Sequence, residues 1–164
     1  MDIASRSPLI AATVIVLGTL VASPAVGVIE LSDHRQSHAD LGTGNVTVAN
    51  ASLPPSAGFE KGKYGSESYY LRVPDATVKF ERVTGQPVLN YKLNVPALSY
   101  SRQSVYFVDE SDSGKQVTFK LSKDTLPPET FSREEYTGEV ALVMRTNGSA
   151  RVLANQTITV EVRK

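Results

Sequence analysis

The sequence predicts an all-β protein: an antiparallel β-sandwich of about eight strands, with immunoglobulin-like or jelly-roll topology, behind an N-terminal apolar signal or anchor helix. From residue 44 onward, apolar and polar residues alternate with the period of two that half-buried strands require, and no segment sustains a helical period. Turn-forming pairs such as Pro74-Asp75 and Thr84-Gly85 separate these runs. We therefore expect one sandwich domain at 44–164.

The leading segment is apolar and uncharged from Ser7 through Ile29. As a helix these residues would reach roughly 34 Å, enough to cross a bilayer. However, Pro24 interrupts the segment, and Ser23-Pro24-Ala25 resembles a signal-peptide cleavage site. The flanking charges favour a cytoplasmic N-terminus and an exported remainder. Residues 1–29 are therefore either a signal peptide that is cut near Ala25 or a retained membrane anchor.

Residues 30–43 are polar and have no apolar period, which predicts a tether between this segment and the sandwich. The two histidines of the chain, His34 and His38, lie here beside Asp33 and Asp40. On a helix their spacing would place both imidazoles on one face, where they could bind a metal. Because the tether has no helical apolar stripe, we interpret it as a solvated linker.

Eight segments of the exported part have the alternation of strands, and the turns between them suggest how they pair. Asn147-Gly148 tolerates positive φ at both centres of a tight turn, so it should join 138–146 to the C-terminal strand as a hairpin. The segment 125–136 has room for one helical turn at most. The segment 52–66, rich in Pro, Gly and Ser, is expected to be a long loop. The expected strands are 45–51, 67–73, 76–83, 87–95, 103–109, 115–122, 138–146 and 156–163.

The C-terminal sequence "QTITVEVRK", residues 156–164, is expected to present a free strand edge. A free edge can accept or donate a strand, which would let the protein assemble by β-strand addition. Arg163 and Lys164 are charges of the kind that prevent such pairing. Self-association through this edge is therefore one possible behaviour of the protein.

Four of the six asparagines open the N-x-S/T sequence that marks N-glycosylation: Asn45, Asn50, Asn147 and Asn155. A bulky glycan needs an exposed position on the exported side of the membrane, so these signals agree with export. The alternative is that Asn-rich turns and Thr-rich strands produce such sequences as by-products. Asn147 in particular is also required by its hairpin.

The composition argues against several classes of function. Lys plus Arg and Asp plus Glu both number 17, and no long basic run occurs, so nucleic-acid binding is not expected. The chain has no cysteine, which removes disulfides, thiolate catalysis and Cys-based zinc sites. No Gly-x-Ser-x-Gly turn or phosphate-binding glycine loop occurs. We therefore expect neither an enzyme nor a cofactor.

One acidic loop is a candidate calcium site. Asp109, Glu110 and Asp112 gather around Gly114, and clustered carboxylates can hold calcium through oxygen ligands. Their spacing misses the twelve-residue calcium loop, and the same residues make an ordinary polar turn. Either reading fits the sequence.

Tyr136 has a sequence context that suggests a structural hydrogen bond. It precedes Thr137-Gly138 at the start of a predicted strand. In immunoglobulin-type sandwiches a tyrosine at such a corner bonds back to the backbone a few residues upstream. We expect the same bond here.

Several stretches, "YYLRVPDATVKFERV", "SRQSVYFVDESDSG" and "GEVALVMRTNG" among them, look like exported immunoglobulin-like sandwich proteins of archaea. The layout of "GVIELSDHRQSHADLGTGNVTV" is also similar to the start of TasA/camelysin-type matrix proteins, with Ser32, Asp33, Gly44 and Asn45 matching and Leu31 replacing an aromatic residue. The second resemblance implies a jelly-roll subunit of a fibre or biofilm matrix.

The sequence thus favours an exported, glycosylated, non-enzymatic β-sandwich on the extracellular side of the cell membrane, either anchored or secreted. Its expected partners are the membrane, through an uncleaved residue 1–29 segment, and other surface proteins or further copies of itself. A fibre or matrix subunit is the first alternative. A surface domain that binds calcium or a small ligand is the second.

Overall fold

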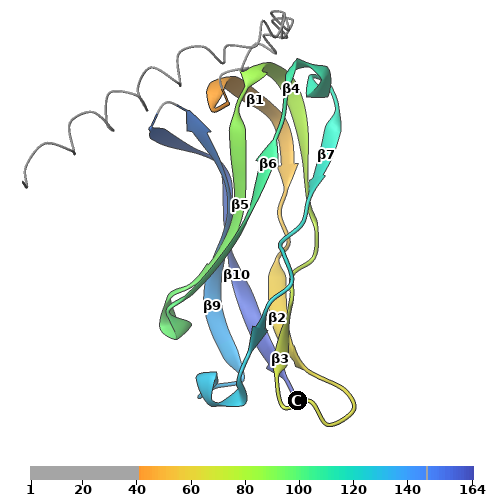
Figure 1. Ribbon diagram of the computed structural model, residues 1–164, viewed down its shortest axis with the longest axis vertical. Coiled ribbons are helices and arrows are strands. Elements are labelled where there is room, and N and C mark those ends of the chain that lie inside the picture. Colours follow the sequence, from red (N-terminus) through yellow and green to blue (C-terminus); the bar gives the residue numbers. More distant parts are fainter. Residues whose placement is uncertain (1–40, 147) are drawn as a thin grey trace, which may run out of the picture. The chain divides into compact units, whose positions relative to one another are not determined.

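The computed structural model describes residues 41–146 and 148–164, which form ten β-strands in two sheets (Figure 1). The predicted N-terminal apolar helix, residues 1–29, and the tether up to residue 40, with its two histidines, lie outside the described residues. In the described part of the chain, no helix is long and apolar enough to cross a membrane.

The smaller sheet has three antiparallel strands in the order β1-β4-β7. They are β1 (Thr43–Ser52), β4 (Ala76–Gln86) and β7 (Gln116–Phe119). Gly44 of β1 crosses Gly85 of β4 so closely that a Cβ on Gly44 would lie 1.9 Å from the carbonyl oxygen of Thr84. This crossing therefore requires glycine at position 44.

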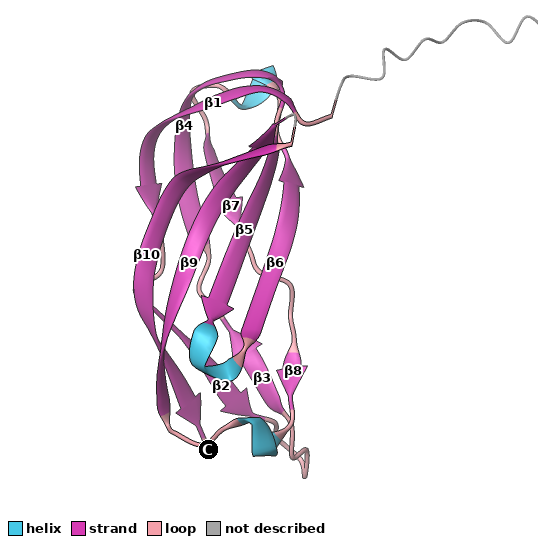
Figure 2. Cartoon of the chain, turned by 90° about the vertical axis from the view of Figure 1, so that its left-hand side faces the viewer, coloured by secondary structure: helices cyan, strands magenta, loops and turns pink. Residues whose placement is uncertain are grey.

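The larger sheet has seven strands in the order β6-β5-β9-β10-β2-β3-β8. One pair, β2 with β10, is parallel, and the other pairs are antiparallel. Figure 2 shows β10, β9, β5 and β6 side by side. The strands are β2 (Ser56–Lys61), β3 (Tyr69–Arg72), β5 (Val88–Val95), β6 (Tyr100–Phe107), β8 (Thr125–Leu126), β9 (Glu135–Thr146) and β10 (Ser149–Arg163). Three short 3₁₀ helices complete the described structure: η1 (Pro96–Leu98), η2 (Glu110–Asp112) and η3 (Pro128–Thr130).

The two sheets pack around a single apolar core, so the predicted all-β sandwich is confirmed. Both sheets contribute completely buried side chains, listed here by sheet: Val78, Phe80 and Phe119 from the smaller, and Phe59, Leu89, Tyr91, Leu93, Val140 and Leu142 from the larger. Along β5 every second residue, from Leu89 to Val95, is fully buried. The period of two in the sequence is therefore the period of burial.

All eight expected strands are present, but the prediction of a loop over 52–66 is wrong. Residues 56–61 form β2, which pairs with β10 on one side and β3 on the other. Ala57 and Phe59 point into the core and are 6% and 0% exposed. The sequence did not predict this strand, because Pro54-Pro55, Gly58 and Gly62 are typical of a loop. Phe59 is the only large apolar residue in it. Ala57, Gly58 and Phe59 are all buried, as in an inner strand, in a sequence that otherwise resembles a loop.

The free edge expected over 156–164 is present only at residues 156–158, which pair with β9 alone among the described strands. Residues 159–163 of β10 pair with β2, and 149–161 pair with β9. The C-terminal part of β10 is therefore an inner strand, because the unexpected β2 occupies its other side. Arg163 and Lys164 instead form ion pairs, with Glu161 at 2.8 Å and Glu134 at 2.9 Å.

The predicted hairpin between β9 and the C-terminal strand is confirmed. Thr146 pairs with Ser149 across the turn, and Gly148 has a φ of 80°. β10 begins directly after the turn, earlier than residue 156, where the sequence placed it. The segment 125–136 contains the single short turn η3, as expected, together with β8.

Candidate interaction surface

The larger sheet has one face on the core and one face toward solvent. On β5 the residues between the buried ones, Val88, Asn90, Lys92 and Asn94, point away from the core. The register aligns them with the outward residues of β6 and β9: Val88 with Phe107 and Arg145, and Asn90 with Val105 and Val143. We call the solvent side of β6, β5, β9 and β10 the outer face.

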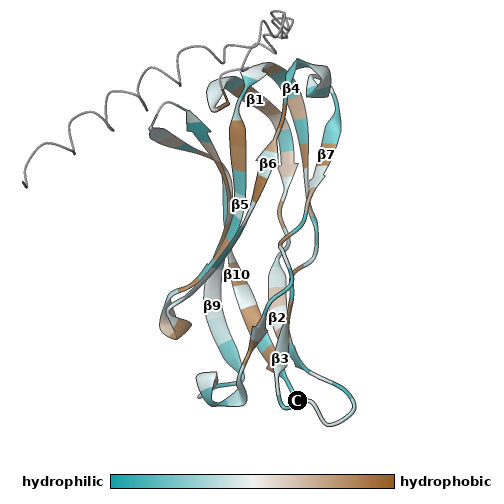
Figure 3. Ribbon diagram, viewed as in Figure 1, coloured by the Kyte–Doolittle hydropathy of each residue, from teal (hydrophilic) through white to brown (hydrophobic). Residues whose placement is uncertain are grey.

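An apolar patch lies at one end of the outer face. It consists of Val88, Val105, Phe107, Val143 and Val152, aligned across the four strands. Three of these side chains are strongly exposed: Val105 at 49%, Val152 at 57% and Phe107 at 65%. Figure 3 shows apolar bands on β5 and β6 at this level. We call these five residues the outer-face patch.

Leu41 extends the patch at the point where the described chain begins. Its side chain is 65% exposed, and it lines a hollow of about 580 Å³ together with Val88 and Arg145. Among the described residues, six large apolar side chains are exposed, and four of them lie here; the others are Tyr64 and Tyr70. Their concentration on one face is typical of an interaction site rather than of scattered surface residues.

A buried polar group lies in the middle of the patch. Asn90 is only 5% exposed, because Val105 and Val143 flank it on the neighbouring strands. Its Oδ1 is buried and has no hydrogen-bond partner in the described structure. An unpaired buried amide oxygen is destabilising unless water or another polar group satisfies it.

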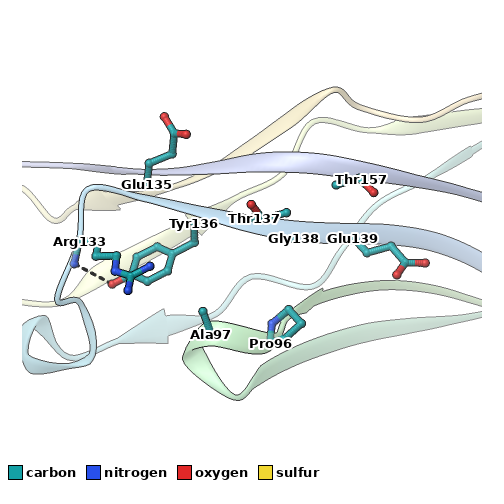
Figure 4. A pocket seen from close by; sticks show the side chains of 9 residues that line it. All are labelled: Pro96, Ala97, Arg133, Glu135, Tyr136, Thr137, Gly138, Glu139 and Thr157. Atoms are coloured by element: carbon teal, nitrogen blue, oxygen red, sulfur yellow. Dashed lines mark hydrogen bonds between the residues drawn. The ribbon is translucent and has the colours of Figure 1, made fainter.

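A groove of about 430 Å³ lies further along the outer face (Figure 4). Pro96 and Ala97 of η1 form one wall, and the outward side chains of β9 form the floor. Tyr136 lies at its end, where the hydroxyl accepts hydrogen bonds from the backbone N–H groups of Ser132 at 2.8 Å and Arg133 at 2.9 Å. The predicted corner bond is therefore confirmed.

The groove contains two carboxylates that are too far apart to act together. Glu135 and Glu139 lie on the same side of β9, and four residues of a strand span roughly 13 Å. Paired-carboxylate hydrolysis uses separations of about 5 to 9.5 Å. Figure 4 shows the two side chains at opposite ends of the groove. The groove therefore does not hold Glu135 and Glu139 at the spacing of a glycoside-hydrolase carboxylate pair.

The predicted glycosylation residues lie along one side of the sandwich. Asn45 and Asn50 are exposed on β1, and Asn155 is exposed on β10, where its Nδ2 donates to Glu139 at 3.3 Å. Asn147 lies outside the described residues. On this side β1 pairs with β4 alone among the described strands, and residues 149–158 of β10 pair with β9 alone.

Arg151 bridges the two free edges on this open side. Its Nη2 donates to Oδ1 of Asn45 at 2.9 Å and to the carbonyl oxygen of Val46. Register shifts interrupt β1 on both sides of Val48 and interrupt β10 after Val152. An inward-pointing charge and irregular registers are the features that protect free edges from pairing with another chain.

The calcium candidates serve a local structural role. Oδ1 of Asp109 accepts the N–H of Ser111 at 2.8 Å, and Oδ2 of Asp112 accepts the N–H of Asp109 at 3.2 Å, which together cap η2. Hydrogen bonds from the side chain and backbone of Ser111 hold the pKa of Asp109 below its usual value. Across 41–146 and 148–164, no three His, Asp or Glu side chains come together as a metal site.

The comparisons with known proteins leave the family of the chain open. No protein-family model matches the sequence, and neither does a curated protein. A glycosyl hydrolase family 2 (GH2) member from Bacteroides cellulosilyticus DSM 14838 aligns with a TM-score of 0.38 and 14% identity, over 74% of this chain and 15% of that chain. A second structure of a GH2 member from Bacteroides cellulosilyticus gives a TM-score of 0.35 and 12% identity, over 72% and 13%. The chain therefore spans a small part of either hydrolase.

The outer-face patch was not predicted from the sequence, although a signal for it exists. Residues 105–108 and 140–144 are uninterrupted apolar runs inside strands that otherwise alternate. An uninterrupted run indicates a strand that is apolar on both faces. Recognising which face meets solvent required the order of the strands, because β6 and β9 are far apart in the sequence and are joined through β5.

Proposed function

We propose that this chain is an exported, non-enzymatic cell-surface protein whose β-sandwich has a structural or interaction role. The observation that carries the proposal is the outer-face patch: one face of the larger sheet encloses the core while the other exposes Val105, Phe107 and Val152 to solvent. An exposed apolar sheet face of this kind contacts other macromolecules.

Export and glycosylation are supported by two features that do not depend on each other. The apolar segment 7–29 has the length and flanks of an export signal. The described asparagines of the N-x-S/T sequences, Asn45, Asn50 and Asn155, are all exposed, as a glycan requires. We propose that they carry glycans.

An immunoglobulin-like topology is the finer description of the fold that we propose. β1 pairs in the smaller sheet, whereas β2 crosses to the larger sheet and runs parallel to β10. Tyr136 makes its backward bond at the start of β9. Two features therefore support the immunoglobulin-like arrangement over the jelly roll. The first two strands, β1 and β2, belong to different sheets, and Tyr136 forms a tyrosine corner.

Intact-mass measurement of the protein from its native source tests export and modification together. We expect either a chain that begins near Val26 or a full-length chain recovered from the membrane, with added mass at the glycosylation asparagines. An uncleaved, unmodified chain in the soluble cytosolic fraction would contradict the proposal.

A fibre or matrix subunit that assembles by strand addition is the second candidate. The observation in its favour is the free edge of β10 at residues 149–158, beside the free edge of β1. It ranks second because Arg151 and the register shifts protect these edges. Strand addition predicts open-ended growth with concentration in sedimentation. A species that stops at one or two copies would exclude it.

A further inference from the structure

We propose that the groove beside η1 binds the oligosaccharide that is attached to Asn155 of the same chain. The inference rests on the proposed function, because it requires a glycan on Asn155. It deepens that function by giving the groove a ligand of defined chemistry, and the experiment below separates a failure of the contact from a failure of glycosylation.

Asn155 lies beside one end of the groove. Its glycosylation sequence is Asn155-Gln156-Thr157, and Thr157 itself lines the groove. Asn155 and Thr157 are both exposed on β10, and alternate residues of a strand share one face of the sheet. The side chain of Asn155 therefore emerges on the face that contains the groove.

The atom that carries an N-linked sugar lies next to a residue of the groove. Nδ2 of Asn155 donates a hydrogen bond to Oε1 of Glu139 at 3.3 Å, and Glu139 lines the groove. An asparagine amide has two N–H donors, and glycosylation replaces one of them. The second can still donate to Glu139, so this bond holds the attachment point at the end of the groove.

The groove runs away from this attachment point along β9. Figure 4 shows Glu139 and Thr157 at one end, and Arg133 and Glu135 at the other. From Glu135 to Glu139 the strand spans roughly 13 Å. A chain of sugars that starts at Asn155 can therefore lie along the groove.

The polar lining of the groove suits a ligand that is rich in hydroxyl groups. The carboxylates of Glu135 and Glu139 accept hydrogen bonds, which sugar hydroxyls can donate, while Arg133 supplies donors. The hydroxyls of Thr137 and Thr157 can do either. Within the described residues, Arg133 and Glu135 form no ion pair, so their charged groups are available to a ligand.

The size and the apolar wall of the groove fit the same ligand. Its volume of about 430 Å³ lies within the range of about 300 to 1,000 Å³ that small-ligand sites have. Pro96 and Ala97 form a wall against which the C–H groups of a sugar ring can pack. Polar groups along an apolar wall are the usual composition of a ligand site.

Periodate oxidation of the glycoprotein from its native source tests the contact. Mild periodate cleaves the vicinal diols of accessible sugars, and glycopeptide mass spectrometry reports the rate at each asparagine. We expect the Asn155 glycan to be oxidised several-fold more slowly in the folded protein than in the urea-unfolded protein. The glycan on Asn50, which is exposed on β1 and makes no side-chain hydrogen bond to a described residue, should react equally in both states.

Two variants of the groove and one matched control assign the protection to the groove. Thr137→Lys on β9 and Ala97→Lys on the opposite wall place a long side chain in the groove, so either should abolish the protection of the Asn155 glycan. Thr118→Lys makes the same change at an exposed position of β7 in the smaller sheet and should leave the protection intact. All three positions are exposed, so the melting temperature should stay unchanged.

Equal oxidation of the Asn155 glycan in the folded and unfolded protein would overturn the inference. Protection that survives both Thr137→Lys and Ala97→Lys would also overturn it, because the sugar would then lie elsewhere. An Asn155 without a glycan would overturn it as well, whereas glycans at Asn45 or Asn50 would still support the proposed function.

Discussion

Replacing Phe59 by alanine tests whether β2 belongs to the core. Phe59 is completely buried, and its ring lies 5.5 Å from Tyr100 and 5.0 Å from Phe131, measured between centroids. Removing a buried phenylalanine costs about 3 to 5 kcal/mol through lost transfer energy and the cavity left behind. Aromatic pairs of this kind contribute about 0.5 to 1.5 kcal/mol within that loss. Because domains have only about 5 to 15 kcal/mol of stability, Phe59→Ala should remove a large fraction of it.

Urea unfolding followed by circular dichroism measures the effect of Phe59→Ala. With an m-value of about 2 kcal/mol per molar urea, a loss of 4 kcal/mol lowers the midpoint by about 2 M. Tyr64→Ala, in the exposed turn after β2, is the control and should shift stability by less than about 0.5 kcal/mol. If Phe59→Ala costs no more than the control, then 52–66 is the surface loop that the sequence suggested and β2 does not close the core.

Three further predictions concern hydrogen bonds, pH and a turn. Tyr136→Phe leaves two backbone N–H groups without their acceptor and should lower the free energy of unfolding by about 1 to 3 kcal/mol in urea titrations. Burial raises the pKa of Tyr91, and burial with a bond to a carboxylate raises that of Tyr100. Stability is therefore complete below the unfolded-state pKa of 10.0 and should fall as the pH rises above it, by up to about 1.4 kcal/mol per pH unit for each tyrosine. Tyr91→Phe should reduce that slope, and an unchanged slope would exclude Tyr91 as its source. Gly148→Ala, at a φ of 80°, should cost about 1 kcal/mol in thermal unfolding, and a neutral effect would contradict the strained turn.

The sequence predicted most of the fold because burial and alternation coincide along the strands. In β5, every apolar residue from Leu89 to Val95 that the alternation assigns to the core is fully buried. Asn147-Gly148 predicted the β9–β10 hairpin through the backbone conformations that its turn requires. The hydrogen bonds of Tyr136 were also predictable from local sequence. A tyrosine at the start of a strand lies close to the backbone a few residues upstream, here Ser132 and Arg133.

The parts that could not be predicted depend on contacts between distant segments. β2 is stabilised by parallel pairing with the last strand, more than ninety residues later, and its own sequence contains a single strong core residue, Phe59. That pairing also makes the C-terminus an inner strand. The outer-face patch depends on the strand order β6-β5-β9-β10, which no local pattern contains.

Surface labelling of intact cells tests the central claim, that the sandwich is displayed outside the membrane. The chain contains no cysteine, so a single Tyr64→Cys substitution at a fully exposed side chain gives one labelling site on a blank background. A membrane-impermeant maleimide should label Tyr64→Cys equally before and after lysis, while the natural chain stays unlabelled. Labelling that occurs only after lysis would place the domain inside the cell and contradict the proposed function.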